Sequence, residues 1–256
     1  MKRTRAQLKT QARQALEGNY GVVIGTMLVL SVIILVFCVL LYMMIVYTNF
    51  SGGLESFSIG MALIWYVLYW SVVSLFGIGI LRVIYQICMA GTADFGDLFY
   101  AFRSHPMRFL GVFALLVLIR LLANIPGFTI SVIGKIMGGN GGMLLEYGSV
   151  PVNLVMQFFV SLQYTLAPLV LIDHPDYGIM ESLRSSKELM KGNCWRYVVL
   201  ILSFIGVLLL GYLTLGIGLL WLFPYYQCTV LFFYLDRKEE YGPPEPAPVP
   251  ETNFWS

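Results

Sequence analysis

Long runs without charge alternate with short charged segments along this chain. Residues 18–54, 56–81 and 197–235 contain no Asp, Glu, Lys or Arg. A helix rises about 1.5 Å per residue and the hydrocarbon core of a bilayer is about 30 Å thick, so a membrane-spanning helix needs about 20 residues. The pattern therefore predicts an all-α, polytopic transmembrane bundle with six spans. We place them at about 21–46, 57–81, 107–125, 149–172, 196–211 and 217–235.

The last uncharged run is divided because a single helix over 197–235 would extend about 58 Å, nearly two bilayers. Gly211 and Gly216 flank "YLTL", where we expect a tight turn that makes a hairpin of spans five and six. Pro224 falls within the second of these helices and should kink it, because its nitrogen cannot donate a hydrogen bond. Tyr225 and Tyr226 follow the kink inside the bilayer, so their hydroxyls need partners.

Composition supports the same class of protein. The chain is 58% hydrophobic and 12% charged, with a mean hydropathy of +0.77. Soluble domains carry about 25% charged residues, so we expect an integral membrane protein. The formal net charge of +2 is too small to indicate nucleic-acid binding. We expect membrane lipids as partners and no nucleic acid.

Lys and Arg are distributed unevenly between the connecting segments. Arg108 and Arg196, at the very ends of their spans, are counted with the adjoining segments 82–108 and 173–196. Of the 15 Lys and Arg then assigned to segments between spans, 14 fall on alternate segments. The exception is Lys135, in an expected outer loop at 126–149. By the positive-inside rule, the basic segments and both termini lie in the cytoplasm.

An amphipathic stretch precedes each span that leaves the cytoplasm. Apolar residues recur at helical spacing in 5–20, 94–103 and 179–195, as suits a helix lying in the membrane interface. Residues 18–19 and 192–193 are both Gly-Asn, a pair that stops a helix through a left-handed residue. We interpret the chain as three units, each an interfacial helix followed by a hairpin. The alternative is that any cytoplasmic loop can be amphipathic.

The domain organisation follows from these patterns. Residues 1–241 form a single transmembrane domain. Residues 242–256 contain five prolines and are expected to be a disordered cytoplasmic tail.

Four motifs resemble a known family. They are "LKTQARQALEGNY" (8–20), "IPGF" (125–128), "LAPLVLIDHPDYGIMESLRSSKELMKGNCW" (166–195) and "LSFIGVLLLGYLTLGIGLLWLFPYYQCTVLFFYL" (202–235). They resemble the bacterial integral membrane family catalogued as domain of unknown function 975, although the long segment after "IPGF" departs from its pattern. The resemblance implies a polytopic protein of the bacterial cytoplasmic (plasma) membrane. It implies no established reaction.

Arg120 is the charged residue inside a proposed span. A charge at that depth costs about 2.5 kcal/mol or more, which makes Arg120 a functional candidate. It also lies close to Ile125, at the expected outer end of the span, from where a long side chain can snorkel to the interface. Both readings stay open: snorkelling, or contact with a ligand or partner.

Polar side chains gather in the fourth span. Asn153, Gln157, Gln163 and Tyr164 should face other helices or a wet cavity rather than lipid. Hydrogen bonds between helices are the simpler interpretation, and a polar pathway is the alternative.

The third amphipathic stretch carries Arg184, Lys187 and Lys191, which are candidate contacts for anionic lipid headgroups. Arg184 can also pair with Glu188 one helical turn away. In that case this face is simply solvated.

No catalytic motif is recognisable. The sequence has no nucleophile–base pair at a known spacing, no phosphate loop and no HExxH. Cys38, Cys88, Cys194 and Cys228 form no CxxC pair, so their spacing predicts neither a zinc site nor a disulfide framework. The motif "DHP" at 173–175 is a weak metal signal and is better explained as a turn. We expect no catalytic residue, metal or cofactor.

These patterns favour a non-enzymatic membrane protein. It would serve export of, or protection against, a small molecule or peptide, or act as an accessory factor of a membrane complex. Two alternatives stay open: a lipid-handling enzyme embedded in the membrane, and a passive channel or carrier. All Asp and Glu lie outside the proposed spans, which argues against ion-coupled transport. The pattern leaves open a membrane-protein partner or a second copy of the chain.

Overall fold

The structure, a computed structural model, describes residues 3–50, 55–104, 106–214 and 216–241. These residues form helices joined by short connections, and none of them lies in a strand. The elements are α1 (Arg5–Leu16), α2 (Tyr20–Phe50), α3 (Glu55–Ala90), the 3₁₀ helix η1 (Phe95–Phe99), α4 (Tyr100–Arg103), α5 (Pro106–Met137), α6 (Gly139–Tyr164), α7 (Ala167–Asp173), α8 (Ile179–Met190), α9 (Cys194–Leu202), α10 (Ile205–Leu213) and α11 (Leu219–Tyr241). The expected tail at 242–256 lies outside the described residues.

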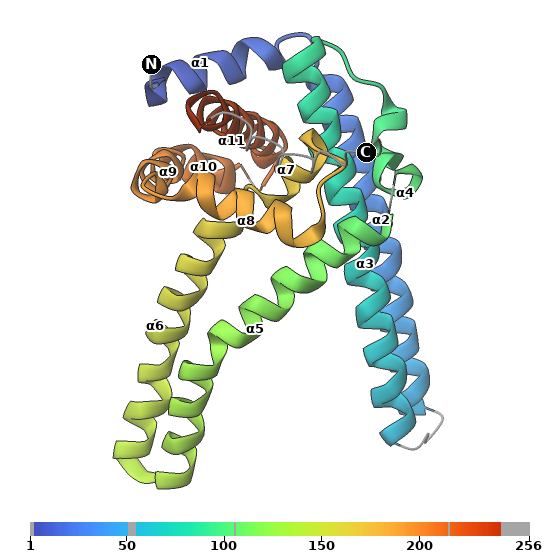
Figure 1. The fold of residues 1–256 in the computed structure, drawn as a ribbon. Helices are drawn as coiled ribbons and strands as arrows, with labels where there is room; N and C mark the ends of the chain where they lie inside the picture. Colours follow the sequence, from blue (N-terminus) through green and yellow to red (C-terminus); the bar gives the residue numbers. More distant parts are fainter. Residues whose placement is uncertain (1–2, 51–54, 105, 215, 242–256) are drawn as a thin grey trace, which may run out of the picture.

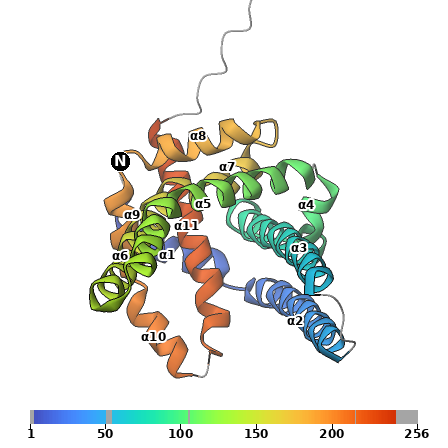
Figure 2. The same cartoon turned by 90° about the horizontal axis from the view of Figure 1, so that it is seen from below.

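Two long helical hairpins extend from one end of the molecule (Figure 1). The first is α2–α3 and the second is α5–α6, and both point the same way. Helices α1 and α7–α11 gather at the opposite end, and we call them the head. Within the head, α9, α10 and α11 run across the ends of the hairpins rather than alongside them, as the view from below also shows (Figure 2).

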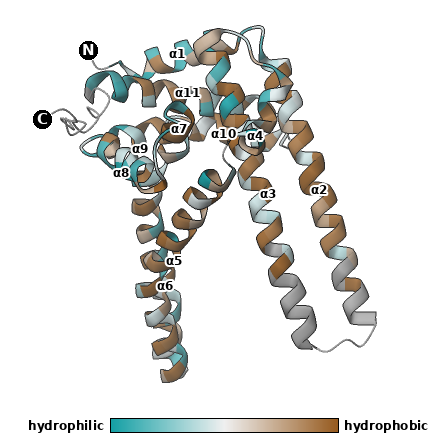
Figure 3. Ribbon diagram, turned by 45° about the vertical axis from the view of Figure 1, so that its right-hand side comes forward, coloured by the Kyte–Doolittle hydropathy of each residue, from teal (hydrophilic) through white to brown (hydrophobic). Residues whose placement is uncertain are grey.

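The hairpins expose apolar side chains along most of their length (Figure 3). Five segments are long and apolar enough to cross a membrane: 20–43, 67–90, 106–137, 139–173 and 194–213. In the most apolar stretches of the first and third segments, only 11% and 17% of the residues are buried, so these helices present their surface outward. Such a surface suits lipid and not water. The predicted span at 217–235 falls in α11, which is not among the five, and the count of six spans stays a prediction.

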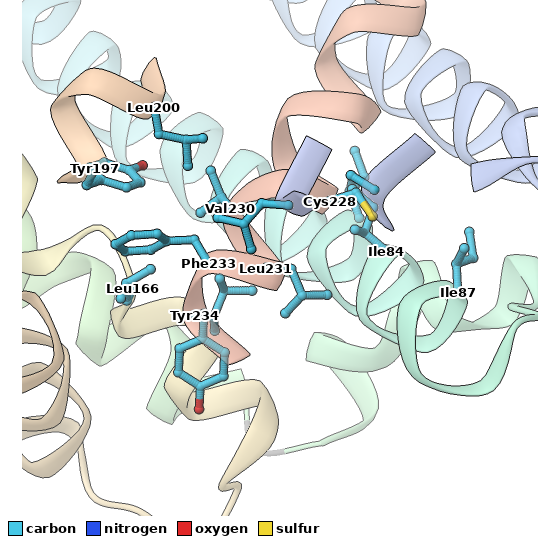
Figure 4. Packing of buried hydrophobic residues seen from close by; sticks show 14 of the residues in the cluster. Ile84, Ile87, Leu166, Tyr197, Leu200, Cys228, Val230, Leu231, Phe233 and Tyr234 are labelled. Atoms are coloured by element: carbon cyan, nitrogen blue, oxygen red, sulfur yellow. The ribbon is translucent and has the colours of Figure 1, made fainter. Parts of the chain in front are cut away.

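The head has an apolar core built around α11 (Figure 4). Cys228, Leu231 and Phe233 of α11 are fully buried, and Ile84 and Ile87 of α3 pack into the same cluster. Removing a side chain of this size from contact with water contributes about 1.5–3 kcal/mol. The core therefore fixes the first hairpin to the head.

Helix α1 covers this core with one face. Leu8, Ala12 and Leu16 recur at helical spacing and are buried against the core cluster that includes α11. Thr4 caps the helix, because its hydroxyl accepts from the backbone N–H of Gln7 while the Gln7 side chain accepts from the Thr4 N–H. The apolar face of this amphipathic stretch is thus occupied by protein and is not free to lie on lipid.

The prediction of an outer loop at 126–149 is wrong, because most of this segment is helical. Helix α5 continues through Pro126 to Met137, and α6 begins at Gly139. The turn between them needs only Gly138 and Gly139, whose φ angles are +62° and +61°. A proline weakens a helix without ending it when neighbouring helices stabilise the backbone around it, as they do in membrane proteins.

Small residues bring α5 and α6 together. Ala123, Gly127 and Gly134 of α5 are buried, as are Gly142 and Ser149 of α6. A Cβ atom added to Gly142 would lie 2.3 Å from the carbonyl oxygen of Gly134. Because lipid gives apolar helices no hydrophobic reason to associate, this close backbone packing is the main force holding the hairpin closed.

The segment expected to hold spans five and six is also more broken than the sequence suggested. The predicted span at 196–211 is divided at residues 203–204 into α9 and α10. The chain then turns at the expected place, where the N–H of Gly216 donates to the carbonyl of Gly211 and Gly216 has a φ of +86°. Pro224 lies inside α11, which continues to Tyr241.

Replacing Gly142 with alanine tests the close contact in the second hairpin. We expect Gly142→Ala to lower the free energy of unfolding by about 1–3 kcal/mol, because the added Cβ meets backbone that can move only with the whole helix. The matched control is Gly148→Ala in the same helix, where a Cβ would meet nothing within 4 Å. Thermal unfolding of the purified protein in detergent checks both variants. Equal melting temperatures for the two would contradict the proposed packing.

Candidate functional site

A buried carboxylate joins two helices of the head to the first hairpin. Asp173 ends α7, and its side chain is only 8% exposed. Its Oδ1 accepts from the hydroxyl of Tyr85 on α3, and its Oδ2 accepts from Tyr234 and Lys238 on α11, each at 2.6 Å. Tyr234 and Lys238 are four residues apart, so one face of α11 presents both donors.

The hydrogen bonds of this cluster suit a structural role. The three donors occupy both oxygens of Asp173, and charge-assisted bonds of this kind are the strong ones. His174 lies beside it, with Nε2 3.5 Å from Asp173 and its ring stacked on Tyr177. Within the described ranges, no three His, Cys, Asp or Glu side chains come together as a metal site. We interpret Asp173 as a latch that fixes α7 and α3 to α11.

A second charged cluster joins the end of α11 to the segment before α1 and to the start of α9. Arg237 is fully buried and donates to Asn193 Oδ1 at 3.0 Å and to Asp236 at 2.7 Å. Asp236 also accepts from the backbone N–H of Arg3 and pairs with Arg196, both at 3.0 Å. The N-terminal segment, the start of α9 and the last turns of α11 are thereby held in one network.

The two Gly-Asn pairs have similar structural roles. Gly18 and Gly192 have φ angles of +86° and +75°, so both helices do end through a left-handed residue, as predicted. Asn19 then donates to the carbonyl of Gly91 at 2.9 Å, while Asn193 accepts from Arg237. Each asparagine thus ties the end of an amphipathic helix to another helix of the molecule.

Arg120 lies near the middle of α5. The sequence placed it close to the outer end of a span, but α5 continues to Met137. The side chain is exposed, and its guanidinium makes no hydrogen bond or ion pair with any residue that the structure describes. Its carbonyl accepts from Gln157 at 2.8 Å and from Asn124 at 3.1 Å. Arg120, Asn124 and Gln157 therefore form a polar patch on an apolar hairpin.

The other candidates of the fourth span and of α11 are distributed along the helices. The carbonyl of Gln163 accepts from Ser186 of α8 at 3.0 Å, and Tyr164 packs in the apolar cluster of α5 and α7. The ring of Tyr225 packs at a tilt against Phe204, with 5.3 Å between the ring centroids. They do not converge on one cavity with Pro224.

It is Tyr226, not Tyr225, whose hydroxyl finds a partner. It lies 3.2 Å from the hydroxyl of Tyr197, which lies 3.2 Å from that of Thr165. This short relay links α11, α9 and the end of α6. It is the interhelical hydrogen bonding expected of polar groups in this region.

The candidate lipid contacts lie on the exposed face of α8. Arg184 donates to Glu188 at 3.1 Å, and Lys187 and Lys191 are exposed. Exposed ion pairs contribute about 0–1 kcal/mol. Contact of these residues with lipid stays a prediction.

Comparison with known proteins gives one match. The family model described as "Protein of unknown function (DUF975)" matches residues 1–240. The chain belongs to the DUF975 family. No curated protein and no solved structure matches it. The DUF975 match covers the head and both hairpins, and with five long apolar helices it indicates a multi-pass membrane protein.

Sequence reasoning missed the charged clusters of this DUF975 protein. Asp173 and Lys238 are 65 positions apart and Arg237 and Asn193 are 44 apart, so no local spacing announces either contact. One signal was present: Asp236, Arg237 and Lys238 directly follow an uncharged run on the same helix. Because α11 continues to Tyr241, beyond its apolar part, these charged side chains meet the neighbouring helices.

The Asp236 cluster makes stability depend on pH. Burial by itself would raise the pKa of Asp236, but the hydrogen bonds from Arg237 and Arg3, with the charges of Arg237 and Arg196, hold this pKa below its usual value. A lowered pKa in the folded state contributes stability above the unfolded value of about 3.9, and this is lost as the pH falls through the folded pKa. The stabilisation is therefore complete at neutral pH.

We expect Asp236→Asn to destabilise the protein by about 1–3 kcal/mol at pH 7, because it removes one of the two carboxylates that pair with buried Arg237 and leaves Glu240 as the other. The difference between wild type and variant should shrink below about pH 4. Melting temperatures in detergent from pH 7 to pH 3 measure this. Asp176→Asn, at an exposed position, is the control and should follow the wild type throughout. A gap that stays constant with pH would contradict the role of the carboxylate.

Proposed function

We propose that this chain is a non-enzymatic accessory protein of the bacterial cytoplasmic membrane. In this proposal it binds a partner membrane protein through the α5–α6 hairpin. The observation that carries the proposal is the exposed, unpaired guanidinium of Arg120 in the middle of α5.

The position of Arg120 along α5 supports this reading. Arg108 and Lys135 lie near the two ends of the helix, about 18 Å and 22 Å from Arg120 at 1.5 Å per residue. In a bilayer core of about 30 Å, Arg120 then falls near the midplane. Snorkelling from there to an interface is harder than from the end of a shorter span.

The energetic cost points to a partner. A lone arginine at the centre of a spanning helix costs about 2.5–3.5 kcal/mol. Gln157 and Asn124 use their amides on the carbonyl of Arg120, which leaves the guanidinium for another molecule. A carboxylate on a transmembrane helix of a partner protein matches it in charge and depth and accepts two parallel hydrogen bonds. Lipid phosphates lie at the interface and not at this depth.

The arrangement of the head supports a particular placement in the membrane. Both termini are predicted to lie in the cytoplasm, and this prediction holds for six membrane crossings and also for four. Because the chain reverses between α10 and α11, these helices add two crossings or none. Their course across the hairpins favours a form with four crossings and with α9–α11 lying along the cytoplasmic leaflet (Figure 1).

The non-enzymatic part of the proposal rests on the charged groups of the head. Asp173 and Asp236 are each engaged by at least two donors from other helices, as expected of structural clusters. The two hairpins expose much of the apolar surface and diverge from each other (Figure 3), whereas the helices of a channel or carrier would enclose a pathway for a substrate.

Arg120→Leu tests the proposal. A photo-reactive amino acid at position 121, whose native leucine is 60% exposed, would be activated in membranes of cells that make the protein. We expect a crosslink to a transmembrane peptide that contains Asp or Glu. In Arg120→Leu the yield should fall at least about tenfold, because 1.4 kcal/mol or more of binding is lost. Mass spectrometry of the crosslinked peptide is the measurement.

Two controls accompany this experiment. Arg184→Leu removes an exposed arginine of the head and should leave the crosslink unchanged, whereas Arg120→Lys keeps the charge and should retain part of it. Crosslinks to lipid alone, or the same protein crosslink with and without Arg120, would contradict the proposal.

A further inference from the structure

Two of the four cysteines lie side by side where the first hairpin meets the head. Cys88 belongs to the last turn of α3 and Cys228 to α11, and their sulfur atoms are 2.7 Å apart. They are 140 positions apart in the sequence, so no motif connects them. Figure 4 shows Cys228 within the apolar cluster that also holds Ile84 and Ile87.

We propose that Cys88 and Cys228 are a redox-active pair that forms a disulfide when the protein meets a hydroperoxide. In a disulfide the sulfurs are about 2.05 Å apart, so the pair needs to move by less than about 1 Å. Buried side chains hold both helices in this position. Ile84 lies one turn before Cys88 and Ile87 directly before it, while Val230 and Leu231 follow Cys228. The sulfur atoms therefore have only a short distance to close when the disulfide forms.

The two sulfurs differ in access. Cys228 is fully buried, whereas Cys88 is partly exposed at the end of α3. An oxidant from outside the head thus meets Cys88 first, and Cys228 acts as the resolving thiol. This division of roles is usual for redox-sensing cysteines.

The reaction balances with one hydroperoxide, ROOH. The Cys88 thiolate attacks the terminal oxygen, the O–O bond breaks, and the alkoxide takes up a proton and leaves as ROH. Cys88 is then a sulfenic acid. The Cys228 sulfur attacks the Cys88 sulfur, the S–OH bond breaks, and the hydroxide takes the Cys228 proton and leaves as water. Two thiols are oxidised to a disulfide, and ROOH is reduced to ROH and water.

The consequence is a reversible covalent link between the first hairpin and the head. Cytoplasmic thiols are kept reduced, so the dithiol is the resting form there. The disulfide would join α3 to α11, the two helices that Asp173 already connects through Tyr85 and Tyr234. Oxidation would therefore lock an existing contact.

The test uses the full chain in isolated membranes treated with hydrogen peroxide or with cumene hydroperoxide, which enters lipid. Free thiols are blocked in SDS, so that burial does not protect them, and the protein is digested and analysed without reduction. We expect a Cys88–Cys228 linked peptide pair that disappears after treatment with a reductant. A faster reaction with one of the two peroxides identifies water or lipid as the route to Cys88.

Matched variants separate the pair from the other cysteines. Cys38→Ser and Cys194→Ser should retain the linked peptides, while Cys88→Ser should abolish them and leave Cys228 as a free thiol. Cys228→Ser should also abolish the linked peptides. If this variant does not accumulate, Cys228→Ala replaces it, and the linked peptides of the wild type remain the test of the pair. Recovery of both cysteines as free thiols, under conditions that oxidise the exposed Cys38, would overturn the proposal.

Discussion

The hydrocarbon core of a bilayer offers no hydrogen-bond partner to a backbone amide, and this constraint shapes the molecule. Helices satisfy their own backbone, so the chain uses helices wherever it faces lipid. The α5–α6 hairpin shows how far this goes, because helix continues through Pro126 and the turn is reduced to Gly138 and Gly139. Association of such helices depends on backbone contact between small residues, since lipid is as apolar as the side chains.

The head is stabilised differently, by a buried apolar core and by contacts between charged groups. Its amphipathic helix α1 and the apolar part of α11 bury a core, and the charged end of α11 is fixed by Asp173, Asn193 and Arg196. These contacts connect segments from the start, middle and end of the chain. They hold the first hairpin and the helices that follow α6 to α11.

The sequence predicted the parts of this fold that follow from local pattern. Apolar runs longer than about 20 residues, the left-handed glycines at 18 and 192, and the turn between Gly211 and Gly216 all follow from residue type and spacing. The helical course of 126–149 does not follow from local pattern, because the sequence "NIPG" at 124–127 is typical of a helix end. Proline and glycine are tolerated within membrane helices, where neighbouring helices stabilise the backbone.

The contacts of the candidate sites could not be predicted from the sequence. The partners of Asp173, Arg237 and Cys228 come from distant helices, and periodicity along one helix carries no information about which helix it will meet. The depth of Arg120 was misjudged because it depended on where α5 ends.

The central claim is that the hairpins cross the membrane and the head stays on one side. Its most direct test places single cysteines at Asn140→Cys, beside the turn of the second hairpin, and at Lys187→Cys on α8, in a background without the four natural cysteines. A membrane-impermeant maleimide is applied to intact spheroplasts and to inverted vesicles. The proposed topology predicts that position 140 reacts only in spheroplasts and position 187 only in inverted vesicles. Reaction of both positions from the same side would contradict the claim.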